Sequence, residues 1–220
     1  MGPLVSRRAK LGGALLLVGS VQFILAMGVV QLYYPGYSLT ENAVSDLGGS
    51  SSPLAWLFNS SVRALGVLAI AGLVLVYGAF RPRWSTRIGV AAFIIAAVGA
   101  FGVGTFPEGS PELGGAIHGV MSLVTFLFSG IGLVVVGFAM VRDTRWDGYR
   151  LYTLVSGVVT LVALTLSAVG WYPVLGPGGM ERLIIAPVLL WGIVVGTHLL
   201  RLKTYVPGAS RTGSAPQTFE

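Results

Sequence analysis

The sequence predicts an all-α, polytopic integral membrane protein with six transmembrane helices. Of its 220 residues, 54% are hydrophobic and 10% are charged, whereas soluble domains carry roughly 25% charged residues. The mean hydropathy is +0.81, and the apolar residues form six stretches that could each cross a hydrocarbon core about 30 Å thick. This composition excludes a disordered chain and a soluble enzyme with an ordinary surface. Because the chain has no cysteine, disulfide scaffolds and thiol chemistry are excluded as well.

The six predicted spans are rich in Gly, Ala, Val and Leu and lack the polar–apolar alternation of a barrel strand. The first follows a basic segment but is too long for the apolar region of a signal peptide, so we interpret it as a retained anchor. The pairs Gly115/Gly119 and Gly192/Gly196 favour close helix packing, within the chain or in a homo-oligomer. The predicted spans are Leu11–Leu32, Trp56–Phe80, Ile88–Phe106, Gly114–Val141, Leu151–Trp171 and Leu183–Leu200.

Basic residues predict the orientation of these spans. Twelve of the 14 Lys and Arg residues flank the spans on one side, which by the positive-inside rule is the cytoplasm. The twelve are Arg7, Arg8, Lys10, Arg81, Arg83, Arg87, Arg142, Arg145, Arg150, Arg201, Lys203 and Arg211. Both termini are therefore predicted to be cytoplasmic, in a multi-pass protein of the cell membrane.

The same distribution accounts for the net charge of +6. It indicates contact with anionic lipids of the inner leaflet, and we expect no nucleic-acid binding. Residues 206–220 are rich in Pro, Gly, Ser and Thr and are predicted to be a disordered cytoplasmic tail. Residues 1–205 then make up a six-helix transmembrane domain.

The ends of the first, third and fifth spans suggest an internal repeat. Each span leaves the membrane on an aromatic–proline pair that is soon followed by a glycine. The spacing of about 60–70 residues accommodates one two-helix hairpin, but aromatic belts and proline stops also recur in membrane proteins without repeats. A threefold hairpin duplication and chance recurrence both stay open. The pairs are Tyr34-Pro35, Phe106-Pro107 and Tyr172-Pro173, followed by Gly36, Gly109 and Gly176.

The first outer loop is predicted to contain a short helix that lies in the membrane interface. Ser38-x-x-Glu41 fits a capping box and Gly48-Gly49 fits a helix end, which together predict a helix over Leu39–Leu47. Three polar residues of this helix are spaced i, i+3 and i+4 and share one face. They are Asn42, Ser45 and Asp46.

Two arginines and one histidine are predicted at the outer ends of the spans. Arg63 lies about 18 residues, or ~27 Å of helix, before Arg81, and this places it at the outer boundary of the hydrocarbon. Arg182 and His118 lie at a similar height. Because an arginine just inside a span is costly unless it is paired or can reach the interface, we expect ion pairs for both arginines. The nearest acids are Asp46, Glu108 and Glu181.

Several of these residues form a pattern that resembles a known family. The loop Asn42-Ala-Val-Ser-Asp-Leu-Gly48 precedes a Ser-Pro pair, Asn59 at a helix start, a histidine early in the fourth span and Glu181-Arg182. In this the chain resembles the prokaryotic membrane family catalogued as domain of unknown function 998. The resemblance implies a six-helix membrane protein and no particular reaction. The residues that correspond to the family's signature are Asn42, Ser45, Asp46, Gly48, His118, Glu181 and Arg182.

Four interpretations of the outer polar residues stay open. In the first, Arg63 and Arg182 bind the phosphate or carboxylate of a small molecule or lipid headgroup. In the second, the residues form a structural ion-pair network that holds the first loop on the bundle. The candidate site comprises Asn42, Ser45, Asp46, Asn59, Arg63, His118, Glu181 and Arg182.

The third interpretation is an intramembrane hydrolase of a lipid-like substrate that uses Asp46, His118 and Glu181, or Ser45 with His118 as its base. The fourth is a small transporter whose path is lined by hydroxyl groups of the later spans. Such hydroxyls more commonly bond to carbonyls of their own helix. We expect no cofactor and no bound metal. The hydroxyl-bearing candidates are Ser122, Thr125, Ser129, Thr160 and Thr165.

Overall fold

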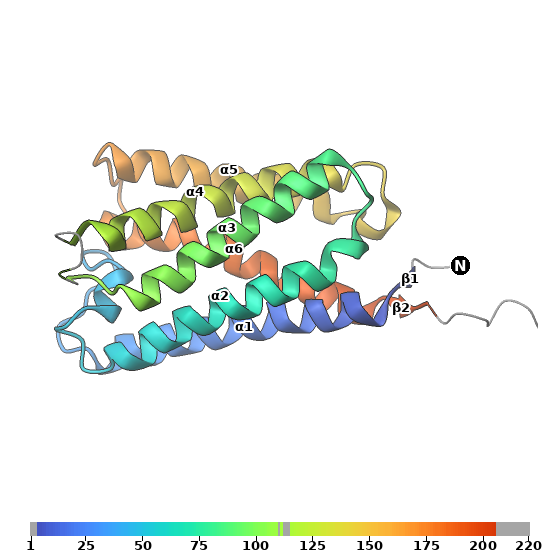
Figure 1. Ribbon diagram of the computed structural model, residues 1–220. Coiled ribbons are helices and arrows are strands. Elements are labelled where there is room, and N and C mark those ends of the chain that lie inside the picture. The colour runs from blue at the N-terminus through green and yellow to red at the C-terminus, as the bar shows by residue number, and fades with distance from the viewer. Residues whose placement is uncertain (1–3, 110, 112–114, 206–220) are drawn as a thin grey trace, which may run out of the picture.

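A computed structural model describes residues 4–109, 111 and 115–205, and it contains six long helices (Figure 1). Each is long and apolar enough to cross a membrane, which confirms the predicted fold class. The predicted tail over residues 206–220 and Glu112 lie outside the described residues. The helices are α1 (Arg7–Tyr33), α2 (Ala55–Val76), α3 (Trp84–Thr105), α4 (Ala116–Ala139), α5 (Tyr149–Ala168) and α6 (Gly176–Arg201).

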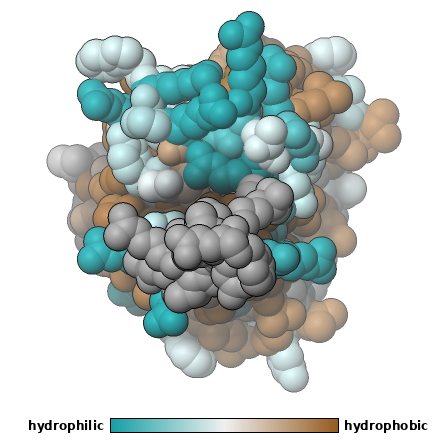
Figure 2. Space-filling view, turned by 90° about the vertical axis from the view of Figure 1, so that its right-hand side faces the viewer, coloured by the Kyte–Doolittle hydropathy of each residue, from teal (hydrophilic) through white to brown (hydrophobic). Residues whose placement is uncertain are grey.

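The six helices form a ring in which each packs on its neighbours in sequence, and α6 closes the ring by packing on α1. We call the end with the α1–α2, α3–α4 and α5–α6 connections the acidic end, because it carries Glu41, Asp46, Glu108 and Glu181. We call the opposite end, which carries the arginines of the α2–α3 and α4–α5 connections, the basic end. Figure 2 looks onto the basic end and shows hydrophilic side chains gathered on its face, with hydrophobic ones around the sides.

The sixth helix begins at Gly176, seven residues before the predicted start at Leu183. Glycine and proline in Gly176–Gly179 indicate a loop by composition, yet proline is well tolerated in the first turn of a helix, where its missing N–H has no partner to lose. Pro177 occupies that first turn. As a consequence, Glu181 and Arg182 project from the body of α6 and not from a flexible connection.

The predicted helix over Leu39–Leu47 is wrong in extent, because the structure has a 3₁₀ helix over Ser45–Gly48. The predicted cap does form, since the amide of Glu41 donates to Ser38 Oγ at 3.2 Å. Residues 39–44 nevertheless do not form a helix, because most of their carbonyls and the Val44 amide bond to groups of α6 or to Tyr37 instead of to one another.

The three glycines that follow the aromatic–proline pairs adopt the same backbone conformation. Gly36, Gly109 and Gly176 have φ angles of 73°, 80° and 65°, a left-handed region that favours glycine. The three aromatic–proline turns therefore share one local conformation at this glycine.

One predicted glycine pair packs helices together, and the other does not. Gly192 faces Ser20 and Gly196 faces the Gly13 carbonyl, so this pair brings α6 against α1 where the ring closes. In contrast, no atom of the residues that the structure describes lies within 4 Å of a Cβ placed on Gly119, and Gly115 serves as the N-cap of α4 with a φ of 83°. The packing prediction for Gly115/Gly119 is therefore wrong within this chain.

We expect Gly196→Ala to lower the free energy of unfolding by about 1–3 kcal/mol, because its Cβ would overlap the Gly13 carbonyl across the α1–α6 contact. Thermal unfolding of the purified protein in detergent measures this loss. Gly119→Ala is the matched control and is expected to unfold like the parent protein. Equal unfolding temperatures for both variants would contradict the assigned ring closure.

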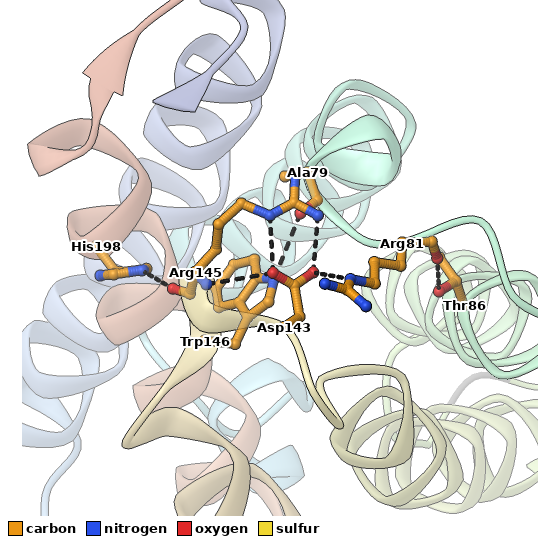
Figure 3. Close-up of polar contacts among 7 residues, drawn as sticks. All are labelled: Ala79, Arg81, Thr86, Asp143, Arg145, Trp146 and His198. Atoms are coloured by element: carbon orange, nitrogen blue, oxygen red, sulfur yellow. Dashed lines mark hydrogen bonds and ion pairs between the residues drawn. The ribbon is translucent and has the colours of Figure 1, made fainter. Parts of the chain in front are cut away.

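The basic end is held together by a cluster around the buried Asp143 (Figure 3). Its carboxylate accepts from Arg145 Nε at 2.9 Å and Nη2 at 2.7 Å, and it lies 3.9 Å from Arg81 Nε. Within the described part of the chain, these two arginines form its ion pairs. The cluster therefore connects the α2–α3 loop to the α4–α5 loop.

Trp146 and His198 extend this cluster to α6. Trp146 stacks on Phe80 with ring centroids 4.7 Å apart and donates its indole N–H to the Ala79 carbonyl at 3.3 Å. His198 Nε2 donates to the Arg145 carbonyl at 2.6 Å. Beside them lie two short strands that the sequence did not predict, β1 (Leu4–Val5) and β2 (Lys203–Thr204). They pair in parallel and so join the segment before α1 to the segment after α6.

Asp143→Asn is expected to lower the free energy of unfolding at neutral pH by about 1–3 kcal/mol, since charge-assisted bonds are lost. Burial by itself raises the pKa of Asp143, but the hydrogen bonds from Arg145 outweigh this effect and hold the pKa below its ordinary value. The Asp143 carboxylate therefore stabilises the folded protein at neutral pH. This stabilisation decreases once the pH falls below about 3.9, because Asp143 binds a proton in the unfolded chain at a higher pH than in the folded protein.

Unfolding of the parent and the variant at about pH 7 and about pH 3 measures this dependence. The exposed Asp147 in the same loop supplies the control, Asp147→Asn. A stability difference between parent and Asp143→Asn that is unchanged in acid would contradict the assignment.

Candidate functional site

The first loop lies directly on the glycine-rich first turns of α6. The amide of Gly178 donates to the Thr40 carbonyl at 2.8 Å. A Cβ on Gly178 would overlap the Asn42 carbonyl, and one on Gly176 would overlap the Thr40 carbonyl. The small residues at the start of α6 therefore allow the loop backbone to approach this helix closely.

Arg182 binds the carbonyl groups of this loop. Its Nη1 donates to the carbonyls of Leu39 at 3.0 Å, Asn42 at 3.3 Å and Gly178 at 2.8 Å. Its Nη2 donates to the Tyr37 hydroxyl at 2.7 Å, and the guanidinium lies 5.5 Å from the centre of that ring. The planar fork of donors in arginine suits several acceptors at once.

Tyr37 completes this network on the loop side. Its hydroxyl donates to the Ala43 carbonyl at 2.7 Å while it accepts from Arg182. Burial raises the pKa of the Tyr37 phenol, and the nearby Arg182 counteracts only part of that effect. The phenol therefore stays protonated and able to donate.

Glu181 binds an amide group of the same loop. Its Oε2 accepts from the Val44 amide at 2.7 Å, immediately before the 3₁₀ helix over Ser45–Gly48. Two consecutive side chains of α6 thus bond both kinds of polar group in the loop backbone. Glu181 accepts from an N–H group, and Arg182 donates to C=O groups.

The asparagines predicted in the site are also engaged with the first loop. Asn42 Nδ2 donates to Asp46 Oδ2 at 3.0 Å, and Asn42 Oδ1 accepts from the Ser38 amide at 3.0 Å. Asn59 at the start of α2 donates to the Gly48 carbonyl at 2.9 Å. Asn42 and Asp46, which were predicted to share one face of a helix, are thus bonded to each other, although residue 42 lies before the 3₁₀ helix and not within a helix.

Arg63 and His118 lie apart from this network. Arg63 Nη2 donates to Ser60 Oγ at 3.1 Å on its own helix. His118 Nδ1 contacts the Phe106 carbonyl at 2.8 Å and thereby links α4 to the end of α3. Both side chains are half-buried.

The expected ion pairs of Arg63 and Arg182 with Asp46, Glu108 and Glu181 are not found among the described residues, whose ion pairs are those of Asp143. The physical reason is the demand of the loop backbone for donors and acceptors where water is scarce. Asp46, His118 and Glu181 each have separate partners, and no three Asp, Glu or His side chains in residues 4–109, 111 and 115–205 could together hold a metal ion.

A cavity inside the ring was missed by the sequence reasoning. It has a volume of about 80 Å³ and lies beneath the first loop, with Val44, Ser45 and Glu181 in its wall. The other polar residues of its wall are Ser122 and Thr125 of α4, and the rest of the wall is apolar. A signal for it exists in the small and hydroxyl-bearing residues of the spans, but which of them face one another depends on the order of helices in the ring.

A second cavity of about 90 Å³ adjoins the first towards the middle of the ring. Its polar wall residues are hydroxyls, including Ser20 and Ser129, and Phe93 and Trp191 stack in its wall with centroids 4.7 Å apart. Arg63, His118 and Arg182 line neither cavity. The two cavities share the wall residues Leu65, Ala100, Thr125, Val188 and Leu189.

Comparison with protein families finds one match, to a model described as "Protein of unknown function (DUF998)", over residues 17–198. The matched range includes every residue of the candidate site and every wall residue of the two cavities except Leu16. Comparisons with curated proteins and with solved structures find no match.

We expect Arg182→Lys to loosen the first loop, because a single ammonium cannot reach the three carbonyls and the hydroxyl that the guanidinium bonds. The predicted loss in unfolding free energy is about 1–3 kcal/mol. Hydrogen exchange of the loop amides, Val44 above all, is expected to become faster.

Arg63→Lys is the control, since it makes the same change of side chain at an arginine that bonds within its own helix. Unchanged loop exchange in Arg182→Lys, or equal acceleration in both variants, would show that Arg182 does not hold the loop.

Proposed function

The chain belongs to the family of proteins of unknown function DUF998, and we propose that it binds a lipid-like molecule inside its six-helix ring. The observation that supports this is the shape and chemistry of the two adjoining cavities. Their walls are mostly apolar, and the one ionisable side chain named in them, Glu181, lies at the acidic end. Such a gradient suits an amphiphile whose chain enters the ring and whose polar end stays beneath the first loop.

The carboxyl group of Glu181 in the cavity wall limits which headgroup the bound amphiphile can have. A carboxylate with hydroxyls beside it favours a group that donates hydrogen bonds, such as an alcohol or an ammonium. The anionic ligand considered from the sequence is less well supported, because Arg182 is occupied by the loop and Arg63 lines neither cavity. For the outer polar residues we accordingly favour the structural interpretation, in which Glu181 and Arg182 hold the first loop over the cavity.

The remaining predictions are retained as part of this proposal. The basic end faces the cytoplasm and contacts anionic lipids of the cell membrane, and the acidic end faces outward. Residues 206–220 form a cytoplasmic tail.

Transport is a second candidate function, favoured by the continuity of the two cavities along hydroxyl-bearing residues. The hydrolase that would use Asp46, His118 and Glu181 has no corresponding support, because these residues have separate partners.

Binding can be tested with a dibrominated long-chain alcohol, which quenches tryptophan fluorescence on close approach. Trp191 lies in the wall of the second cavity, so we expect saturable quenching that is reduced in Trp191→Phe. Val188→Phe fills space in both cavities and is expected to weaken this quenching by at least about tenfold, or 1.4 kcal/mol.

Val67→Phe makes the same substitution at a residue 53% exposed on the outside of the ring, and it is expected to bind like the parent. The matching dibrominated fatty acid tests the headgroup and should bind more weakly than the alcohol. Quenching that does not saturate, or that is equal in Val188→Phe and Val67→Phe, would place the probe in surrounding detergent and refute the proposal.

A further inference from the structure

We propose that Ser122 and His118 form a nucleophile–base pair that cleaves an ester bond of an amphiphile held in the cavity. The proposal rests on the proposed binding function and adds a reaction to it. His118 Nε2 lies 3.4 Å from Ser122 Oγ, and His118 Nδ1 lies 2.8 Å from the Phe106 carbonyl. These are the three parts that serine chemistry requires: a hydroxyl, a base beside it and a group that orients the base.

The Phe106 carbonyl decides which ring nitrogen of His118 acts as the base. A carbonyl can only accept, so in the neutral imidazole Nδ1 carries the proton and donates it to Phe106. Nε2 is then the acceptor, and the Ser122 hydroxyl donates to it. The backbone therefore performs the orienting role that a carboxylate has in other serine enzymes.

Ser122 differs from Thr125 and Ser129, the other hydroxyl-bearing residues of α4. Thr125, Ser129 and Thr165 donate to carbonyls of their own helices, at 2.8, 3.0 and 2.9 Å, as expected for hydroxyls within helices. Ser122 contacts the imidazole of His118 instead, one helical turn away. A hydroxyl of this kind is available to react, whereas those of Thr125 and Ser129 are committed to backbone carbonyls.

The pair is also placed where substrate and water can meet. Ser122 belongs to the wall of the cavity that contains Glu181, and His118 contacts it from outside the residues that form that wall. Ser122 is six residues after the first residue of α4, or about 9 Å along the helix axis. This depth is close enough to the acidic end for water to reach an intermediate.

The reaction proceeds in two balanced steps. In the first, Ser122 Oγ attacks the ester carbonyl carbon, His118 Nε2 takes the hydroxyl proton, and the C–O bond to the alcohol breaks as that proton passes to the leaving oxygen. This gives an acyl-serine and a free alcohol. In the second, water loses a proton to His118 Nε2 and attacks the acyl carbon, the bond from that carbon to Ser122 Oγ breaks, and the proton on Nε2 passes to Oγ. This releases a carboxylic acid and restores the Ser122 hydroxyl and the neutral imidazole.

A fluorophosphonate probe, which phosphonylates activated serines, tests this pair in the full-length protein in detergent. We expect labelling at Ser122, located by peptide mass spectrometry, and none there in Ser122→Ala. His118→Ala is expected to slow labelling by at least about 100-fold, as removal of a general base does. Ser156→Ala removes a serine hydroxyl of α5 that lines neither cavity and should label like the parent.

Binding of the dibrominated alcohol separates this proposal from the binding function. His118→Ala changes a residue that lines neither cavity and is expected to retain saturable quenching, which also shows that this variant is folded. Quenching without labelling of the parent at Ser122 would overturn the reaction and leave the binding function intact. Labelling that persists at the parental rate in His118→Ala would equally overturn the pair.

Discussion

The requirement that every backbone polar group find a partner where water is scarce governs both ends of this ring. At the acidic end, Arg182 supplies donors to the carbonyls of the first loop and Glu181 accepts from a loop amide. At the basic end, His198 and Trp146 donate to the carbonyls of Arg145 and Ala79. Side chains of helices thus hold the irregular connections, and the positions of these connections decide what the ring can enclose.

The close packing of α6 on α1 at glycines and the two cavities occur in different parts of the ring. Gly192 and Gly196 draw α6 onto α1 and close the ring. Nearer the ring axis, side chains of different helices do not fill the space between them, and the two adjoining cavities lie there. Glu181 belongs to both systems, since it bonds the first loop and lines the cavity beneath it. A ligand that displaced the Val44 amide from Glu181 would therefore also alter the loop.

Much of the candidate site could be predicted as a group of residues, but not as a set of contacts. The residues in the family-like pattern, from Asn42 to Arg182, do gather largely around the first loop. Ion pairs were the natural expectation for Arg182, because a sequence shows charges and not the unpaired carbonyls of a loop. Asp143 was missed for a related reason: its burial depends on how the α2–α3 and α4–α5 connections meet.

Composition and hydropathy alone determine the class of this protein and the number of its spans, because crossing a hydrocarbon core imposes a length and a polarity on every helix. The motifs likewise indicate its family. Tertiary structure decides which side chains share a space. The closed ring sets Ser122 in a cavity wall, directs His118 through the Phe106 carbonyl, and turns Arg182 toward backbone oxygens. These relations join residues far apart in the chain, so no local pattern of the sequence encodes them.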